Sequence, residues 1–177
     1  MSGERKNREL EIVYRISQAI TQQHDIPALL NDVLDILETE MGMPRGTLTL
    51  RRPDTDIFVI EASRGLTHEE QRRGQYKLGE GVTGRVAETG EPIVIPDIAR
   101  DPRFLNRTQS RTREKVAFIC VPIVHQRSII GTLSIDRPAA DEASLRHDMN
   151  FLRLVAGLLA QAVQSIRDQI AEHDSLM

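Results

Sequence analysis

The segment from Ile98 to Lys115, IARDPRFLNRTQSRTREK, holds the residues whose chemistry best suits ligand binding. Five arginines and one lysine stand there against Asp101 and Glu114, and the planar guanidinium of arginine pairs well with carboxylates. A polar connection of this length between two buried strands is often a binding loop or a lid. The segment therefore predicts a cover over a pocket for an anionic ligand. A solvated loop that contains a short helix explains the same composition equally well.

The remaining reactive residues give little support to catalysis. Cys120 is the only thiol and lies in FICVP among apolar neighbours, where a buried thiol is expected to be inert. The five histidines are scattered, with no H-x-x-x-H or C-x-x-C spacing, so no metal site is predicted. Asp97 and Asp136 each end a predicted strand, which suits a ligand-binding acid and a plain turn residue equally. We therefore expect a protein that is not an enzyme and needs no cofactor or metal.

A glycine-rich stretch at 79–84, GEGVTG, is similar to the G-x-G-x-x-G motif of dinucleotide-binding turns. Such a turn needs a long apolar strand before it and a full crossover helix after it. Here the preceding residues are Gln75–Leu78, and the helix that follows is short, because Gly90 is placed to end it. We therefore interpret the glycines as a tight turn that seats a short helix on a sheet.

The composition predicts one ordinary globular domain. Of the 177 residues 40% are hydrophobic and 28% charged, and the net charge is −3, which gives no case for direct nucleic-acid binding. The chain has no apolar run of about 18 residues that would predict a membrane span. Its polar N-terminus, MSGERKNRELE, lacks the apolar core of a signal peptide. With a single cysteine, a cytoplasmic location without membrane contact is the simplest expectation.

Hydrophobic periodicity predicts an α+β fold. A first helix is expected over about 7–23, and a second from an N-cap at Asp25 to Gly42. A capping box formed by Thr67 and Glu70 starts a short third helix. Strands are expected at 47–51, 57–62, 93–95, 116–124 and 128–137. We expect a central antiparallel sheet of five or six strands with helices on both faces.

The first and last helices are expected to pack together and to offer a dimer surface. In the first helix Leu10 and Tyr14 mark one face while Ile12 and Ile16 mark another, and a helix apolar on two sides often packs on its own domain and on a partner. The last helix approximates a heptad seam at Leu152, Val155, Leu159, Ala162, Ile166 and Ile170. We expect one domain over 1–170, with 171–177 starting a linker to a further domain, and a parallel homodimer through the terminal helices.

Two segments resemble a known family. Lys77–Asp97, KLGEGVTGRVAETGEPIVIPD, looks like the central signature of GAF domains, and Phe118–Arg137, FICVPIVHQRSIIGTLSIDR, resembles the paired central strands of that fold. The match extends over about Leu10 to Ile166. The chain is further similar to the N-terminal GAF domain of NifA-type transcriptional activators, which precedes an ATPase domain that works on an alternative sigma factor.

The resemblance implies a small-molecule-sensing domain that controls an attached output domain, with the ligand bound under the arginine-rich segment. A small anionic metabolite, such as a 2-oxo acid, is the expected ligand. The candidate ligand-binding residues are Asp97, Arg103, Phe104, Arg111, Phe118 and Ser134. Cyclic-nucleotide GAF domains carry an acidic pair after the phenylalanine, and Ile119–Val121 contain no acid, which argues against cAMP or cGMP. GAF-fold methionine sulfoxide reductases use several cysteines and bilin-bearing relatives use one as an anchor, and a lone strand cysteine favours neither.

The rival interpretation is a GAF domain without a ligand, which serves as a dimerisation scaffold and a docking surface for a regulatory protein. In that case side chains of the domain itself would fill the pocket. The residues expected to do so are Phe104, Phe118, Ile95 and Leu133.

Overall fold

The computed structural model describes residues 2–103 and 115–177. Along these residues the elements are α1 (Ser2–Gln22), α2 (Ile26–Met41), β1 (Arg45–Arg51), β2 (Ile57–Ser63), α3 (His68–Arg73), β3 (Gln75–Lys77), α4 (Gly81–Thr89), β4 (Ile93–Ile95), the 3-10 helix η1 (Ile98–Arg100), β5 (Val116–His125), β6 (Ser128–Pro138) and α5 (Glu142–Ser175). The predicted α+β class is confirmed, and α1 begins about one turn earlier than its apolar pattern indicated.

The six strands form one antiparallel sheet in the order β3-β2-β1-β6-β5-β4. β5 and β6 make its longest hairpin, and the two turn residues, Gln126 and Arg127, have φ angles of 47° and 67°. Two consecutive left-handed residues form the kind of turn that matches the twist of a hairpin. Gly131 in β6 lets β1 approach closely, because a Cβ there would lie 2.3 Å from the carbonyl oxygen of Thr49.

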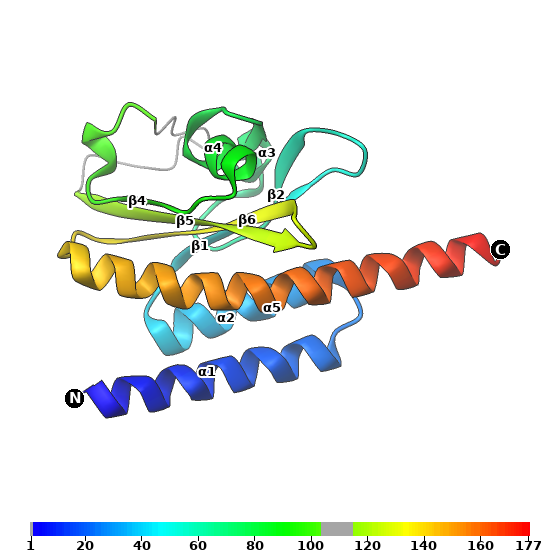
Figure 1. The fold of residues 1–177 in the computed structure, drawn as a ribbon, viewed down its shortest axis with the longest axis horizontal. Coiled ribbons are helices and arrows are strands. Elements are labelled where there is room, and N and C mark those ends of the chain that lie inside the picture. The colour runs from blue at the N-terminus through cyan, green and yellow to red at the C-terminus, as the bar shows by residue number, and fades with distance from the viewer. Residues whose placement is uncertain (1, 104–114) are drawn as a thin grey trace.

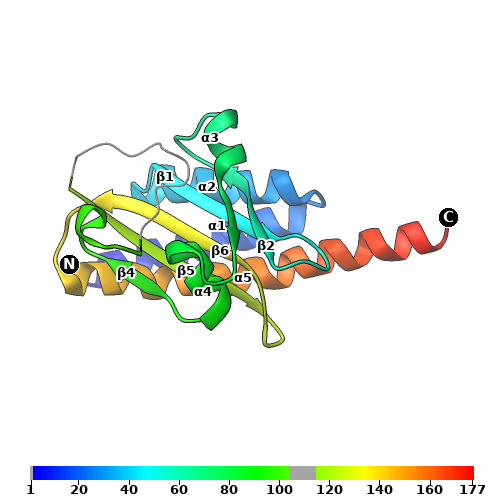
Figure 2. The same ribbon diagram turned by 90° about the horizontal axis from the view of Figure 1, so that it is seen from above.

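Helices cover both faces of the sheet, as expected (Figures 1 and 2). α2 and α5 pack on one face, and α1 forms an outer layer on α2 and α5, so the terminal helices do pack together. α3 and α4 lie on the other face. The main core fills the first side, where Leu34, Leu133 and Leu159 are almost completely buried. Towards its C-terminal end α5 projects beyond the sheet (Figure 2).

The apolar residues of the two terminal helices are buried or exposed in a pattern that differs from the prediction. α1 buries Ile12 and Ile16, whereas Leu10 and Tyr14 are 68% and 63% exposed, so the helix is indeed apolar on two sides. In α5 the heptad positions from 152 to 166 are buried in the core of the domain itself, and only Ile170 of that seam is exposed. The seam is therefore not available to a partner helix. α5 also has the length and composition to cross a membrane, but half of that stretch is buried inside the domain, as in a core helix.

Local signals fix where the helices begin and end. The Asp25 carboxylate accepts a hydrogen bond from the Ala28 amide at 3.0 Å, and Gly42 ends α2 with a φ of 64°. Thr67 and Glu70 form both bonds of the predicted capping box, at 3.1 and 3.0 Å. Each of these predicted boundaries is confirmed.

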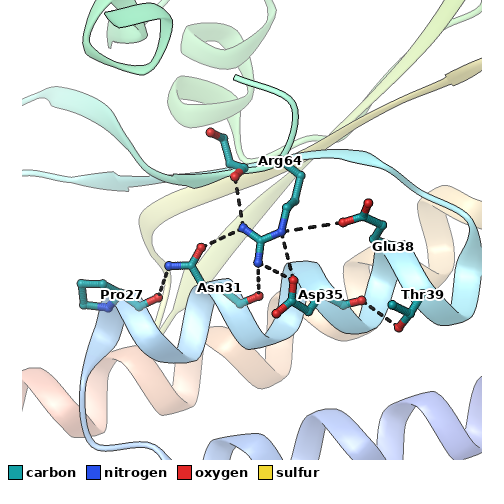
Figure 3. A network of polar contacts seen from close by, with 7 residues as sticks. Pro27, Asn31, Asp35, Glu38, Thr39 and Arg64 are labelled. Carbon is teal, nitrogen blue, oxygen red and sulfur yellow. Dashed lines mark hydrogen bonds and ion pairs between the residues drawn. The ribbon is translucent and has the colours of Figure 1, made fainter. Parts of the chain in front are cut away.

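One arginine joins the end of β2 to α2 (Figure 3). Arg64 Nε and Nη2 donate to Asp35 Oδ1 at 3.1 and 2.5 Å, while Nη1 donates to Asn31 Oδ1 and Nη2 to the Asn31 carbonyl, both at 2.9 Å. Arg64 Nη1 also donates to the carbonyl of Ser63 at 3.2 Å. The planar fork of arginine is suited to such a set of acceptors, so Arg64 ties the helix layer to the loop that leads to α3.

Candidate functional site

The side of the sheet that α4 covers holds the candidate site, and we call it the site face. A second apolar cluster lies there, formed by Val82 and Val86 of α4, Ile95 of β4, Ile98 of η1, and Phe118 and Cys120 of β5. Because strand residues alternate between faces, Leu133 lies on the opposite side, in the main core. The expectation that Leu133 would help to fill a pocket beside Phe118 is therefore wrong.

The glycines at 79–84 position α4. Gly79 and Gly81 have φ angles of 83° and 61°, a backbone conformation that glycine adopts without strain. At Gly84 a Cβ would lie 2.4 Å from the carbonyl oxygen of Lys77, so only glycine lets the helix approach β3 this closely. These glycines serve the packing of a nine-residue helix, which agrees with their interpretation as a structural turn.

Polar side chains run along the centre of the site face. The hydroxyls of Thr49 and Thr132 are 2.6 Å apart and buried, and the Cys120 thiol hydrogen-bonds to Thr132 and Thr83. Burial raises the pKa of the Cys120 thiol to about 12, which outweighs the lowering effect of those hydrogen bonds. The thiol stays protonated at neutral pH and cannot act as a nucleophile, as its position in the sequence predicted.

Charged side chains lie at one end of this face. Asp136 of β6 is only 4% exposed and pairs with Arg45 of β1, whose Nε is 3.5 Å from Asp136 Oδ2. A second nitrogen of the Arg45 guanidinium, Nη2, is buried and has no hydrogen-bond partner among the described residues. Ser134 lies two residues before Asp136 in β6 and is also buried. An arginine, a carboxylate and a hydroxyl thus stand on adjacent strands of the site face.

The predicted site residues are only partly brought together. Phe118 and Ser134 lie on the site face, on neighbouring strands. Asp97 instead caps η1 through the Ala99 amide at 3.1 Å and pairs with Arg100 at 3.6 Å. Phe104 and Arg111 lie outside the described residues.

Arg103 is engaged within its own segment. It donates to Asp101 from Nη2 at 2.6 Å and from Nε at 3.0 Å. These contacts lower the pKa of Asp101 and raise the pKa of Arg103, so the positive charge is already paired. An anion would have to compete with Asp101 for this arginine.

Two of the clefts that described residues line lie on the helix side of the sheet, and a third lies beside α3. One of about 400 Å³ separates the first half of α1 from the ends of α2 and β6, and one of about 410 Å³ runs between α1 and α5. A third, of about 310 Å³, borders α3 and β2. Within residues 2–103 and 115–177 no group of three or more histidine, cysteine, aspartate or glutamate side chains is arranged to hold a metal ion.

The outer surface of α1 and α5 carries exposed apolar side chains. Besides Leu10 and Tyr14, Leu154 and Ile170 of α5 are 51% and 52% exposed. The cleft between the two helices is lined by Ile20, Leu158 and Ala162 together with uncharged polar side chains. We call these residues the terminal-helix surface, and its low charge is typical of a protein contact.

Residues 25–163 match the family described as GAF domain, which is more than half of the chain. The chain belongs to the GAF domain family. The nitrogen fixation protein VnfA of Azotobacter vinelandii is 39% identical over 166 residues, 92% of this chain and 32% of VnfA. The Nif-specific regulatory protein of Herbaspirillum seropedicae is 34% identical over 174 residues, 96% of this chain and 32% of that protein. This GAF domain thus spans about a third of the length of these relatives, and its predicted similarity to NifA-type regulators is confirmed.

Solved structures agree with this assignment. The crystal structure of the A. aeolicus nlh2 GAF domain in an inactive state has a TM-score of 0.80 and 25% identity, and the match covers 90% of this chain and 97% of that one. A free methionine-R-sulfoxide reductase from Neisseria meningitidis, solved with its substrate, has a TM-score of 0.76 and 20% identity, covering 91% of both chains. At that identity the likeness shows the shared fold alone.

Sequence reasoning did not single out three residues that organise the site and its surroundings. Arg45 stands two residues before Thr47 and four before Thr49, so the alternation of β1 would have placed it on the same face. For Asp148 and Arg64 no pattern in the sequence indicated their role. Their importance comes from ion pairs with residues far away in the sequence, Arg5 and Asp35.

Proposed function

We propose that this GAF domain is the sensory module of a transcriptional regulator of the nitrogen-fixation type. The observation that supports it is the similarity, over nearly the whole chain, to proteins named VnfA and Nif-specific regulatory protein. Because the chain spans about a third of those relatives, an attached ATPase and DNA-binding output is part of the proposal. So is a cytoplasmic location.

The proposed ligand is a small anionic metabolite, with a 2-oxo acid as one candidate, bound on the site face. Arg45 supports an anion there, because its buried Nη2 atom has no hydrogen-bond partner in the part of the chain that the structure describes. Ser134 and Phe118 offer a hydroxyl and an apolar wall on the neighbouring strands. Arg103, which is paired to Asp101, contributes less than its position in the sequence suggested.

The ligand would act by favouring one arrangement of the terminal helices. Its effect cannot exceed the difference between its affinities for the two arrangements. α5 is the natural output element, since it projects past the sheet (Figure 2). A homodimer through the terminal-helix surface would place two copies of α5 in one assembly.

The test is a thermal-stability screen of residues 1–177 against 2-oxo acids, amino acids and nucleotides. A ligand at about 100 times its dissociation constant should add about 2.7 kcal/mol to the free energy of unfolding. We expect a carboxylate to stabilise the protein and expect Arg45→Met to weaken that effect more than Arg100→Met. Arg100 is 83% exposed at its side chain and is the matched control. A screen in which no compound shifts the melting temperature would contradict the sensor.

A ligand-free scaffold is the second candidate. The exposed Leu10 and Tyr14 on α1 favour it, because they support a dimer or a docked regulatory protein without any ligand. Sedimentation of the unaltered domain and of Tyr14→Glu would test the contact. A stable dimer that Tyr14→Glu dissociates, combined with a silent ligand screen, would favour the scaffold over the sensor.

A further inference from the structure

The cleft of about 400 Å³ lies at the end of the molecule where α1 and α5 begin and α2 ends (Figure 1). Its lining comes from the first half of α1, the end of α2 with the two residues that follow it, the end of β6 and the start of α5. A cavity of this size accommodates a small organic molecule. Because it lies on the helix side of the sheet and Arg45 does not line it, it is separate from the site face. We call it the N-terminal cleft.

Asp148 of α5 is the most buried charged residue of the N-terminal cleft, with 4% of its surface exposed. Its Oδ1 accepts a hydrogen bond from Arg5 Nη2 at 3.2 Å, and its Oδ2 accepts one from Arg137 Nη1. A buried carboxylate needs such partners, because an unpaired buried charge is costly. Two arginines on a single carboxylate leave this group of three side chains with a surplus of positive charge.

The other two acids that line the cleft are also engaged. A carboxylate oxygen of Glu9 lies 2.6 Å from Nε2 of His147. Glu40 accepts a hydrogen bond from Arg15, which does not line the cleft. Since each of the three carboxylates already has a partner, the cleft is poorly suited to a cationic ligand.

Several hydrogen-bond donors of the cleft are free, by contrast. Arg8 of α1 forms no ion pair or hydrogen bond with any described residue. Arg137 uses Nη1 for Asp148, and no described residue accepts a hydrogen bond from its other guanidinium nitrogens. The hydroxyl of Ser144 has no hydrogen-bond partner among the described residues either. Guanidinium groups and hydroxyls are the donors that bind carboxylates and phosphates, so the unused groups of this cleft match an anion.

We propose that the N-terminal cleft binds a small organic anion, whose carboxylate or phosphate group is held by Arg8, Arg137 and Ser144. The side chains of Met41 and Met43 also line the cleft and suit the carbon skeleton of such a molecule. The proposal does not depend on a ligand at the site face, and each site can fail without the other.

Binding would fasten the first half of α1 to the rest of the domain. From Gly3 to Glu11 no side chain of α1 is buried, and Ile12 is the first residue of the helix that enters the core. Segments with few buried apolar contacts open at low free energy. An anion that contacts both Arg8 of α1 and Arg137 of β6 needs α1 in place, so its binding opposes this opening.

The experiment is an NMR titration of residues 1–177 with inorganic phosphate and, separately, with succinate, at an ionic strength kept constant with chloride. We expect saturable shifts of the amides of Arg8, Arg137 and Ser144 with at least one of the two anions. Saturation by phosphate alone identifies a phosphoryl ligand, and saturation by succinate alone identifies a carboxylate. At about ten times the dissociation constant, hydrogen exchange in the first half of α1 should slow by about tenfold.

The test variant is Arg8→Gln, which removes a free cation without breaking a contact and should therefore fold. We expect it to raise the dissociation constant by about tenfold, the loss of one charge-assisted hydrogen bond. Lys6→Gln is the matched control, because it removes the same charge from an exposed residue of α1 that does not line the cleft. It should raise the dissociation constant by less than about twofold, since salt screens an exposed charge. Arg45→Met, on the site face, should leave the dissociation constant unchanged.

Three results would overturn the proposal. The first is a titration in which neither anion gives a saturable shift. The second is equal weakening by Arg8→Gln and Lys6→Gln, which would reduce the effect to the general charge of α1. The third is binding that Arg45→Met abolishes and Arg8→Gln spares, because the anion would then occupy the site face and leave the N-terminal cleft empty.

Discussion

Replacing Arg64 with methionine should destabilise the domain by about 2 kcal/mol. The guanidinium, with a side chain only 23% exposed, donates to three uncharged oxygens, two on Asn31 and one on Ser63. Each such hydrogen bond contributes about 0.5–1.5 kcal/mol to the free energy of unfolding. Because the side chain is partly exposed, we take the low end of that range for each, which gives about 1.5 kcal/mol for the three bonds together. The pair with Asp35 adds at most about 0.5 kcal/mol, because the Asp35 side chain is 60% exposed.

The assay for Arg64→Met is urea unfolding combined with thermal melting. In a domain of this size a loss of about 2 kcal/mol lowers the melting temperature by about 4–8 °C. Arg64→Lys should lose nearly as much, because an ammonium cannot reach the same set of acceptors (Figure 3). Arg72→Met, an exposed residue of α3, is the control and should change little. If Arg64→Lys is as stable as the unaltered domain, the hydrogen-bond reasoning is refuted. The positive charge of residue 64 would then explain its contribution to stability.

Two further predictions concern a pair of glycines, one crowded and one open, and the buried Cys120. Gly84→Ala should destabilise the domain by about 1–3 kcal/mol, because the added methyl group would clash with the Lys77 carbonyl. Gly157→Ala, at an open position of α5, should instead stabilise it by up to about 1 kcal/mol. Urea unfolding measures both changes. Cys120 should resist alkylation at pH 8 until the protein unfolds, because burial raises the pKa of its thiol to about 12. Because that pKa lies above the unfolded value of 9.0, the protonated thiol contributes its full share to the free energy of unfolding below pH 9 and loses it as pH rises above 9. Cys120→Ala should therefore flatten the decline of the free energy of unfolding at high pH.

Sequence reasoning predicted those parts of the fold that short-range chemistry decides. The caps of α2 and α3 follow from Asp25, Thr67 and Glu70, whose bonds reach only three residues along the chain. The hairpin of β5 and β6 follows from two apolar runs separated by a turn. The resemblance to the GAF signature then predicted the fold in which these elements combine.

Ion pairs, two of them local and one across the sheet, show where Arg45, Arg100 and Arg103 are engaged. The segment after β4 reads as rich in free arginines, yet Arg103 is taken by Asp101 and Arg100 by Asp97. Within residues 2–103 and 115–177, Arg45 has a buried nitrogen without a hydrogen-bond partner, and the sheet places this arginine beside Asp136, a residue 91 positions further along. No spacing rule relates residues that meet only through a sheet register.

The burial of the terminal helices indicates which of them can move in regulation. Leu152, Val155 and Leu159 of α5 are fully buried against the sheet, so α5 cannot rotate without opening the main core. α1 buries Ile12, Ile16 and Ala19 in the core and packs Val13 and Ile20 against it, all in its second half. Its first half is held by polar contacts with α5. Local opening favours elements with few buried apolar contacts. If the domain regulates by switching between two states, we expect α1 to be the element that moves and α5 to remain fixed on the sheet.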